Sequence, residues 1–249
     1  MSMNRISQAN FLKTGIAVAL CLPGLCWGGV GPDELRGDRV GWARLKTPSP
    51  HWKRHATSDP ILTKFFRDQT TLNINPDWYV ADANALDQLC RYPLLFSQGV
   101  AAITERTGRN NIAEYLRRGG FLLIDACHNN RVTPDFDGFL RQQINFYAEV
   151  LPEARVVSLP ATHEIYRCHY QFPAGHPPHT FMAGYDAKKA AHGLYGVMIG
   201  DRMVGLISLC GWQCGWDHVE YPSPSPEGTD VVCMRMVVNI YIYALMQGR

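Results

Sequence analysis

The sequence predicts an α/β fold: a mostly parallel sheet with helices on both faces and a late antiparallel hairpin at one edge. Short apolar runs alternate along the chain with longer segments whose apolar residues recur every three or four positions, which is the pattern of strands followed by helices. The apolar run 121–124 comes directly after Gly119-Gly120 and contains no polar residue. Such a run is typical of a strand that is buried on both faces of a parallel sheet.

The strands are predicted from short apolar or alternating segments. They are 40–45, 71–74, 92–97, 121–125 and 155–159, followed by a hairpin of 194–199 and 203–209. We expect Asn75-Pro76 to stop the second strand, because proline has no N–H to donate to a neighbouring strand. Gly200-Asp201 lies between the last two strands and is typical of a tight hairpin turn.

The helices are predicted from apolar periodicity and from residues that favour helix ends. They are 59–66, 86–90, a helix around Ile112 that closes at Gly119-Gly120, 134–151 and 231–246. Asp59-Pro60 resembles a helix start, with an acid as the N-cap and proline in the first turn. Residues 231–246 are apolar almost all round, so this helix should be buried.

The first 28 residues have the composition of a secretory signal peptide. Arg5 and Lys13 precede an apolar stretch, and Cys26-Trp27-Gly28 offers a small-residue cleavage site. The stretch is shorter than the roughly 20 residues that span a bilayer, so we expect cleavage and no transmembrane segment in the mature chain. The predicted organisation is therefore a signal peptide over 1–28, a flexible lead-in over 29–37 and one α/β domain over 38–249, in a periplasmic or secreted protein.

Charge and cysteine content limit the classes of partner. The chain carries a formal net charge of +2, and loss of Arg5 and Lys13 with the signal peptide leaves a neutral protein, which argues against nucleic acid as a partner. An oxidising compartment permits disulfides. The cysteines that remain are Cys90, Cys127, Cys168, Cys210, Cys214 and Cys233. No dinucleotide or P-loop fingerprint is present, so the sequence names no cofactor.

Polar clusters follow four of the predicted strands. They include Gln98, the segment 125–130, His163-Glu164 and the segment 210–218. Ligands bind at the carboxyl ends of strands in open α/β sheets, so we expect several of these clusters to share one edge. The ligand-binding candidates are Gln98, Asn129, Trp212, Trp216 and Asp217.

Cys127 is the candidate nucleophile, because it lies between a strand and a helix, where a thiol can be activated. The candidate base is His163, oriented by Glu164, or else His128, with Asp125 as the orienting acid. Alternatively, Cys127 is a small buried residue or half of a disulfide, and Asp125 caps the next turn.

Two further groups admit both a binding and a structural interpretation. Metal-ligating side chains are abundant in the second half of the chain: His163, Cys168, His169, His176, His179, His192, Cys210, Cys214, Asp217 and His218. The alternative is a histidine-rich, partly exposed loop within 160–191. Trp212 and Trp216 can stack on sugars or bases, or they can fill the base of the domain.

Several segments occur in an order that resembles a known family. They are Trp42-Ala43-Arg44-Leu45-Lys46, Tyr92-Pro93-Leu94-Leu95-Phe96, Gly119-Gly120-Phe121-Leu122-Leu123-Ile124-Asp125, His163-Glu164-Ile165-Tyr166, Cys214-Gly215-Trp216-Asp217 and Asn239-Ile240-Tyr241-Ile242-Tyr243-Ala244-Leu245. Together they resemble a bacterial family of unknown function, exported or membrane-attached, related in fold to class I glutamine amidotransferase-like domains. The resemblance spans roughly residues 38–247 and implies a flavodoxin-like three-layer sandwich.

The resemblance implies no established activity. True amidotransferases hold their nucleophilic cysteine in a glycine-flanked turn and use a later His-x-Glu pair. Here the turn around Cys127 lacks those glycines, and His163 and Glu164 are adjacent, so glutaminase activity is not carried over.

Two functional hypotheses follow. The preferred one is a non-catalytic module of the cell envelope that binds a glycan, peptide or protein through the sheet edge and the 160–191 loop, since a fold does not by itself confer chemistry. The alternative is a cysteine-dependent hydrolase or transferase that uses Cys127 with His163 or His128.

Overall fold

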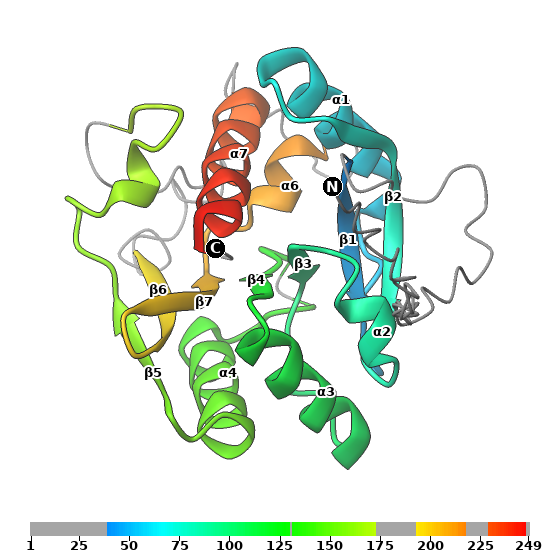
Figure 1. Ribbon diagram of the computed structural model, residues 1–249, viewed down its shortest axis with the longest axis vertical. Helices are drawn as coiled ribbons and strands as arrows, with labels where there is room; N and C mark the ends of the chain where they lie inside the picture. Colours follow the sequence, from blue (N-terminus) through cyan, green and yellow to red (C-terminus); the bar gives the residue numbers. More distant parts are fainter. Residues whose placement is uncertain (1–38, 130, 173–192, 218–228, 248–249) are drawn as a thin grey trace, which may run out of the picture. The chain divides into compact units, whose positions relative to one another are not determined.

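The structure, a computed structural model, describes residues 39–129, 131–172, 193–217 and 229–247. The predicted signal peptide and lead-in lie outside these residues, as do His176, His179, His192 and His218. The described chain forms one seven-stranded sheet in the order β2-β1-β3-β4-β7-β6-β5 (Figure 1). The strands are β1 Val40–Lys46, β2 Ile74–Asp82, β3 Leu94–Ser97, β4 Phe121–Asp125, β5 Ala154–Ser158, β6 Leu194–Ile199 and β7 Arg202–Ser208.

The sheet is mostly parallel, as predicted. Strands β2, β1, β3, β4 and β7 pair in parallel, in the order of a flavodoxin-like doubly wound sheet. Strand β6 pairs antiparallel with both β7 and β5. The antiparallel edge is therefore made of β5 and β6, while β7, the second strand of the predicted hairpin, continues the parallel part of the sheet.

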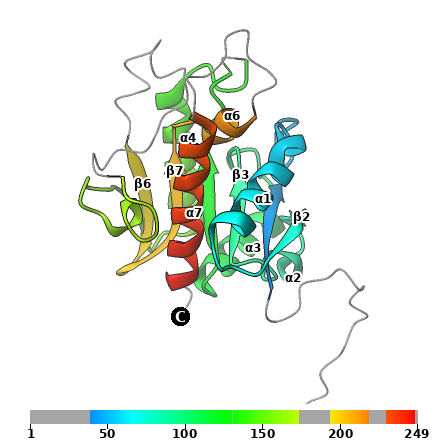
Figure 2. The same ribbon diagram turned by 90° about the horizontal axis from the view of Figure 1, so that it is seen from above.

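Helices cover both faces of this sheet, which makes three layers. They are α1 Asp59–Gln69, α2 Leu86–Leu89, α3 Arg106–Arg117, α4 Phe136–Val150, α6 Trp212–Trp216 and α7 Thr229–Gln247, with short 3-10 turns η1 Ala56–Ser58 and η2 Glu164–Tyr166. Helices α1, α6 and α7 pack on one face, and α3 and α4 pack on the other (Figures 1 and 2).

Each face has its own apolar core, because neighbouring residues of a strand point to opposite sides. Trp42 and Leu123 face α7, whereas Ala43 and Leu122 face α3 and α4. On the α7 face the ring of Trp42 lies 5.4 Å from that of Phe96 and 6.5 Å from that of Trp216, between ring centroids. Burying a large apolar side chain stabilises a fold by roughly 1.5–3 kcal/mol, so this aromatic group anchors β1, β3 and α6 together.

Helix α7 is buried against the sheet, as its composition predicts. Among the described helices it is the one whose length and hydropathy would let it cross a membrane, over Asp230–Gln247, and 56% of that segment is buried. A helix in a protein core has the same character, so this is weak evidence for a membrane span.

Three local predictions differ from the structure. Strand β2 runs through Asn75-Pro76 to Asp82; the proline is tolerated because β2 is an edge strand and its register with β1 shifts between Val40 and Trp42. Asp59 is the first residue of α1 rather than its N-cap, which is Ser58. Residues 212–216, for which the sequence predicted no helix, form the short helix α6.

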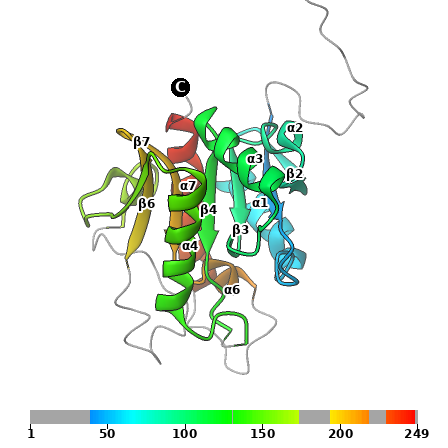
Figure 3. The same cartoon turned by 90° about the horizontal axis from the view of Figure 1, so that it is seen from below.

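The parallel strands β1, β3, β4 and β7 end at a common edge of the sheet. Helix α6 follows β7 at the end to which the arrow of β4 points (Figure 3). The loop after β1, which leads through His55 to α1, starts at the same edge. Chain segments far apart in sequence therefore meet there.

Candidate functional site

Two thiols and one imidazole converge at this edge, and we call them the thiol–imidazole cluster: Cys127, Cys214 and His55. Cys127 lies two residues beyond β4, Cys214 lies in α6 and His55 precedes η1. The Sγ atoms of Cys127 and Cys214 are 3.7 Å apart, and each is 3.7 Å from Nε2 of His55. All three side chains are buried.

His55 is held in an unusual backbone conformation. Its φ is 58° and its ψ 14°, and within the described ranges it is the one non-glycine residue with positive φ. A non-glycine residue in this left-handed region costs on the order of 1–3 kcal/mol and persists where its surroundings impose it. Ser58 contributes to that restraint, since its hydroxyl donates to the carbonyl oxygen of His55 over 2.7 Å. The strain indicates that contacts with the surrounding fold hold His55 in this conformation.

Asp217 orients the imidazole. Its Oδ2 contacts Nδ1 of His55, and both residues are buried. With Nδ1–H donating to the carboxylate, Nε2 is turned toward the two sulfurs. A carboxylate on the remote ring nitrogen is the usual companion of a histidine that ligates a metal, and also of a histidine in a catalytic triad.

The electrostatics of the cluster favour a thiolate at Cys127. A hydrogen bond from Cys214 lowers the pKa of Cys127 to about 4, helped by His55 and the backbone N–H of Asn129 and opposed by burial. Burial lowers the pKa of His55, but its hydrogen bonds to Cys127 and Asp217 outweigh that effect and raise the pKa above its usual value. The thiolate, not the thiol, is both the nucleophile and the metal ligand.

Asp125 holds the segment that carries Cys214. Its Oδ1 accepts from the Ser208 hydroxyl at 2.8 Å and from the N–H of Gly211 at 3.0 Å, and its Oδ2 accepts from the N–H of Gln213 at 3.3 Å. Burial raises the pKa of Asp125 to about 7. These contacts tie β4 to the start of α6, so they fix Cys127 and Cys214 relative to each other.

The predicted bases lie apart from these contacts. Nε2 of His128 is 2.9 Å from the carbonyl oxygen of Leu209, and its ring meets Phe136 edge-on. His163 is the N-cap of η2, where its Nδ1 accepts from the N–H of Ile165 at 3.2 Å and its ring packs on Tyr243 of α7. Glu164 follows within η2. The imidazole in contact with Cys127 is that of His55, and neither predicted base has that contact among those described.

The other predicted binding residues have mixed placements. Gln98 donates through Nε2 to the carbonyl oxygen of Arg54, beside His55, at 3.5 Å. Asn129 accepts through Oδ1 from the N–H of Arg131. Trp212 and Trp216 are fully buried in the core cluster, where they present no surface for stacking.

Most of the predicted metal ligands in the described residues are used elsewhere. The thiol of Cys168 donates to the carbonyl oxygen of Asn239 at 3.2 Å. Nε2 of His169 lies 3.3 Å from the backbone carbonyl oxygen of Gln69. Burial raises the pKa of Cys210 well above its usual value. Of the predicted ligands that the structure describes, only Cys214 and Asp217 join the thiol–imidazole cluster and its orienting contact.

His55 is the site residue that sequence reasoning missed. It belongs to no motif and lies 72 residues before Cys127 and 159 before Cys214. One signal was available: it follows the first predicted strand, and residues after strands share the ligand-binding edge of such a sheet.

The cluster has the dimensions of a zinc site. Tetrahedral zinc with Zn–S of about 2.3 Å and Zn–N of about 2.0 Å separates its ligand atoms by roughly 3.5–3.8 Å. The three observed separations are all 3.7 Å, and the ligand atoms lie within 4.8 Å of one another. Two thiolates and an imidazole are ligands that zinc prefers.

Fold and site together define a three-layer α/β protein with a buried thiol–imidazole cluster at the carboxyl edge of its sheet. The chain belongs to the DUF4159 family, a domain of unknown function, whose model matches residues 42–245. No curated protein matches it. The match confirms that the family is one of unknown function.

Proposed function

We propose that this protein binds a zinc ion through Cys127, Cys214 and His55, with Asp217 as the hydrogen-bond partner that orients His55. The observation that carries the proposal is the set of three equal separations of 3.7 Å between the ligand atoms. Three unrelated segments supply these atoms, so an ion would link the loop before α1, the end of β4 and helix α6.

The proposed ion has three ligands among the described residues. Zinc held by three protein ligands keeps a fourth position for water or for a ligand group, and it can lower the pKa of a bound water to about 7. We propose that this position is where the protein recognises a polar group of its ligand. This develops the binding-module hypothesis, in which an exported protein binds a glycan, peptide or protein of the cell envelope.

Metal analysis tests the proposal directly. The protein is purified without a histidine tag, reduced, loaded with zinc and freed of excess metal. We expect one zinc ion per chain, and after cobalt(II) substitution the near-ultraviolet charge-transfer band of thiolate ligands with the visible bands of a tetrahedral ion. His55→Ala, Cys127→Ser and Cys214→Ser should each reduce metal retention, while Cys168→Ser should retain it fully. A wild-type protein that keeps no zinc under these conditions rules the proposal out.

A second function is favoured by the alignment of Cys127, His55 and Asp217. Sγ of Cys127 is 3.7 Å from Nε2 of His55, and Nδ1 of His55 contacts Asp217, which is the arrangement of a cysteine nucleophile, its base and an orienting acid. In this case the protein is a cysteine-dependent hydrolase or transferase, with His55 in the role earlier considered for His163 or His128.

The two proposed functions differ in their dependence on metal. A cysteine enzyme should turn over substrate in the metal-free state, lose that turnover in Cys127→Ser and be inhibited by zinc. A metalloprotein should show its ligand binding only when loaded. Screening the metal-free and zinc-loaded forms with the same panel of ester, amide and cell-wall fragments therefore tells which function holds.

A further inference from the structure

A fully buried ion pair contacts the chain on either side of His55. Arg44 of β1 and Asp59 of α1 both have 0% exposed side chains. Nε of Arg44 donates to Oδ2 of Asp59 at 2.5 Å, and Nη2 donates to Oδ1 at 2.7 Å. Trp42 adds a hydrogen bond from Nε1 to Oδ2 at 3.0 Å. Burying two charges costs several kcal/mol for each ion, and apolar residues often stabilise a core equally well. Stability alone therefore does not account for this pair.

The third donor of Arg44 reaches the backbone beside His55. Nη1 donates to the carbonyl oxygen of Arg54 at 2.8 Å, and Gln98 donates to the same oxygen. The guanidinium also lies over the ring of Phe96, 5.0 Å from its centroid. One rigid side chain thus holds Asp59, four residues after His55, and Arg54, one residue before it.

The restrained segment is also the strained one. His55 has the positive φ of 58°. The hydroxyl of Ser58, the residue before Asp59, donates to the carbonyl oxygen of His55. Without restraint a non-glycine residue would leave this conformation. Its departure would carry Nε2 away from the sulfurs of Cys127 and Cys214.

We propose that Arg44 and Asp59 are positioning residues that hold His55 at the thiol–imidazole cluster. The inference rests on the proposed metal site for its main measurement. Arginine is required because its planar fork serves a carboxylate and a carbonyl in fixed directions, whereas the single ammonium group of lysine cannot do both with the same geometry.

The test compares Arg44→Lys and Asp59→Asn with the wild type. We expect zinc affinity to fall by about 10- to 100-fold, the range for outer partners of a metal ligand, and the cobalt spectrum to approach that of His55→Ala. In the double variant Arg44→Lys/His55→Ala the losses should not add, because both changes remove the same ligand. Arg202→Lys is the matched control, since Arg202 also donates to a backbone carbonyl, that of Leu116, within a different part of the fold.

Two results would overturn the inference. One is wild-type affinity and an unchanged cobalt spectrum in folded Arg44→Lys and Asp59→Asn. The other is full additivity with His55→Ala. A purely structural pair would lower the melting temperature without changing the ligand set of the folded protein.

A metal-free measurement keeps this test independent of the proposed function. In the wild type, nitrogen NMR of the His55 side chain should show one ring form without averaging, in which Nδ1 stays protonated against Asp217. Arg44→Lys should give the averaged signals of a free ring. If the wild type binds no zinc, the metal proposal fails, and the NMR comparison still decides the role of Arg44. Unchanged signals in the variant would contradict that role.

Discussion

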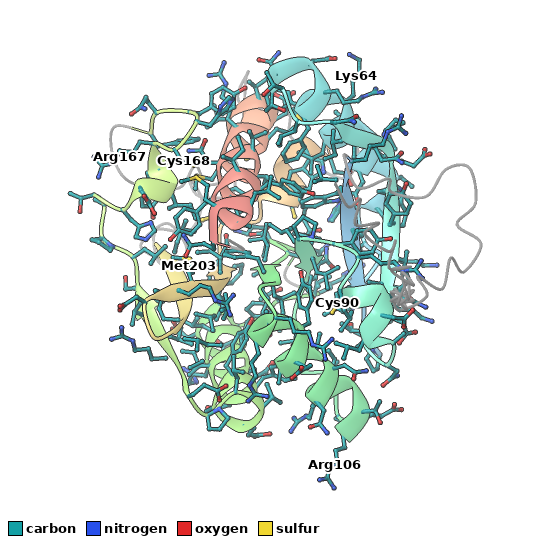
Figure 4. All side chains as sticks on the ribbon, viewed as in Figure 1. Lys64, Cys90, Arg106, Arg167, Cys168 and Met203 are labelled. Carbon is teal, nitrogen blue, oxygen red and sulfur yellow. The ribbon has the colours of Figure 1, made fainter. Side chains whose placement is uncertain are left out.

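Two regions rich in cysteine and histidine contrast in this molecule. The thiol–imidazole cluster joins Cys127, Cys214 and His55 from three remote segments at the carboxyl edge of the sheet. The region around η2, which includes His163, Cys168 and His169, packs beside α7, and Figure 4 shows Cys168 there next to Arg167. Both supply metal-ligating side chains, but only the first brings three such side chains together among the residues described.

The difference lies in what the polar atoms already bind. In the region around η2, the thiol of Cys168, Nδ1 of His163 and Nε2 of His169 are engaged with the backbone, and burial raises the pKa of Cys168 to about 11. In the cluster, neighbouring groups lower the pKa of Cys127 and raise that of His55. A site requires mutual orientation of its donors, and residue composition alone does not supply it.

The largest effect that tests this contrast is stabilisation by metal. A ligand that binds only the folded state at a thousand times its dissociation constant stabilises that state by about 4 kcal/mol. We therefore expect zinc to raise the melting temperature of the reduced wild type and a chelator to reverse it, as followed by calorimetry. Cys127→Ser should respond to neither. An equal zinc response in the wild type and Cys127→Ser would place the metal elsewhere.

Loss of one sulfur ligand should have the next largest effect. Cys214→Ser should weaken zinc binding by more than about 100-fold, which exceeds the contribution of an outer hydrogen-bond partner. Cys168→Ser should leave the affinity unchanged, because that thiol contacts a backbone carbonyl instead. Competition with a chromophoric chelator measures both variants. The prediction fails if the two serine variants behave alike.

Asp217→Asn should have an intermediate effect. The amide is nearly the same size as the carboxylate but carries no charge to orient the Nδ1–H of His55, so zinc affinity should fall by about 10- to 100-fold. Asp135→Asn changes an exposed carboxylate paired with Arg141 and serves as the control. Equal affinities of Asp217→Asn and the wild type would show that Asp217 does not support the ligand.

His163→Ala should have the smallest effect on the site. Zinc affinity should stay at the wild-type value, and the free energy of unfolding should fall by about 1 kcal/mol through loss of the ring contact with Tyr243. Urea unfolding and metal titration measure the two quantities separately. Reduced zinc affinity in this variant would mean that the region around η2 takes part in the site.

Local patterns predicted much of the fold. The uninterrupted apolar run gave β4, the turn residues gave the hairpin of β6 and β7, and the all-round apolar composition of 231–246 indicated the buried helix α7. Two elements differ from the sequence prediction for physical reasons. The predicted second strand ended before Asn75-Pro76, because the sequence does not show that β2 is an edge strand, where proline is tolerated. No helix was predicted over 212–216, because the short helix α6 depends on Asp125, which accepts from the N–H groups of Gly211 and Gln213.

Part of the candidate site could also be predicted. Cys127, Asp217 and the Cys214 segment follow predicted strands, so the carboxyl-edge rule singles them out. The partner of Cys127 could not be found in the same way, because a lone histidine in a loop carries no periodicity or spacing. His55 lies 162 residues from Asp217 in the chain.

The sequence by itself determined the class of fold, since hydrophobic periodicity is a local property that each strand and helix expresses on its own. It also determined the edge of the sheet at which chemistry is expected. Only the tertiary structure decided which side chains meet there. The pairing of Cys127 with His55 and Cys214 depends on strand order, on the strained backbone of His55 and on the buried Arg44–Asp59 pair, and these are contacts between segments that no local pattern encodes.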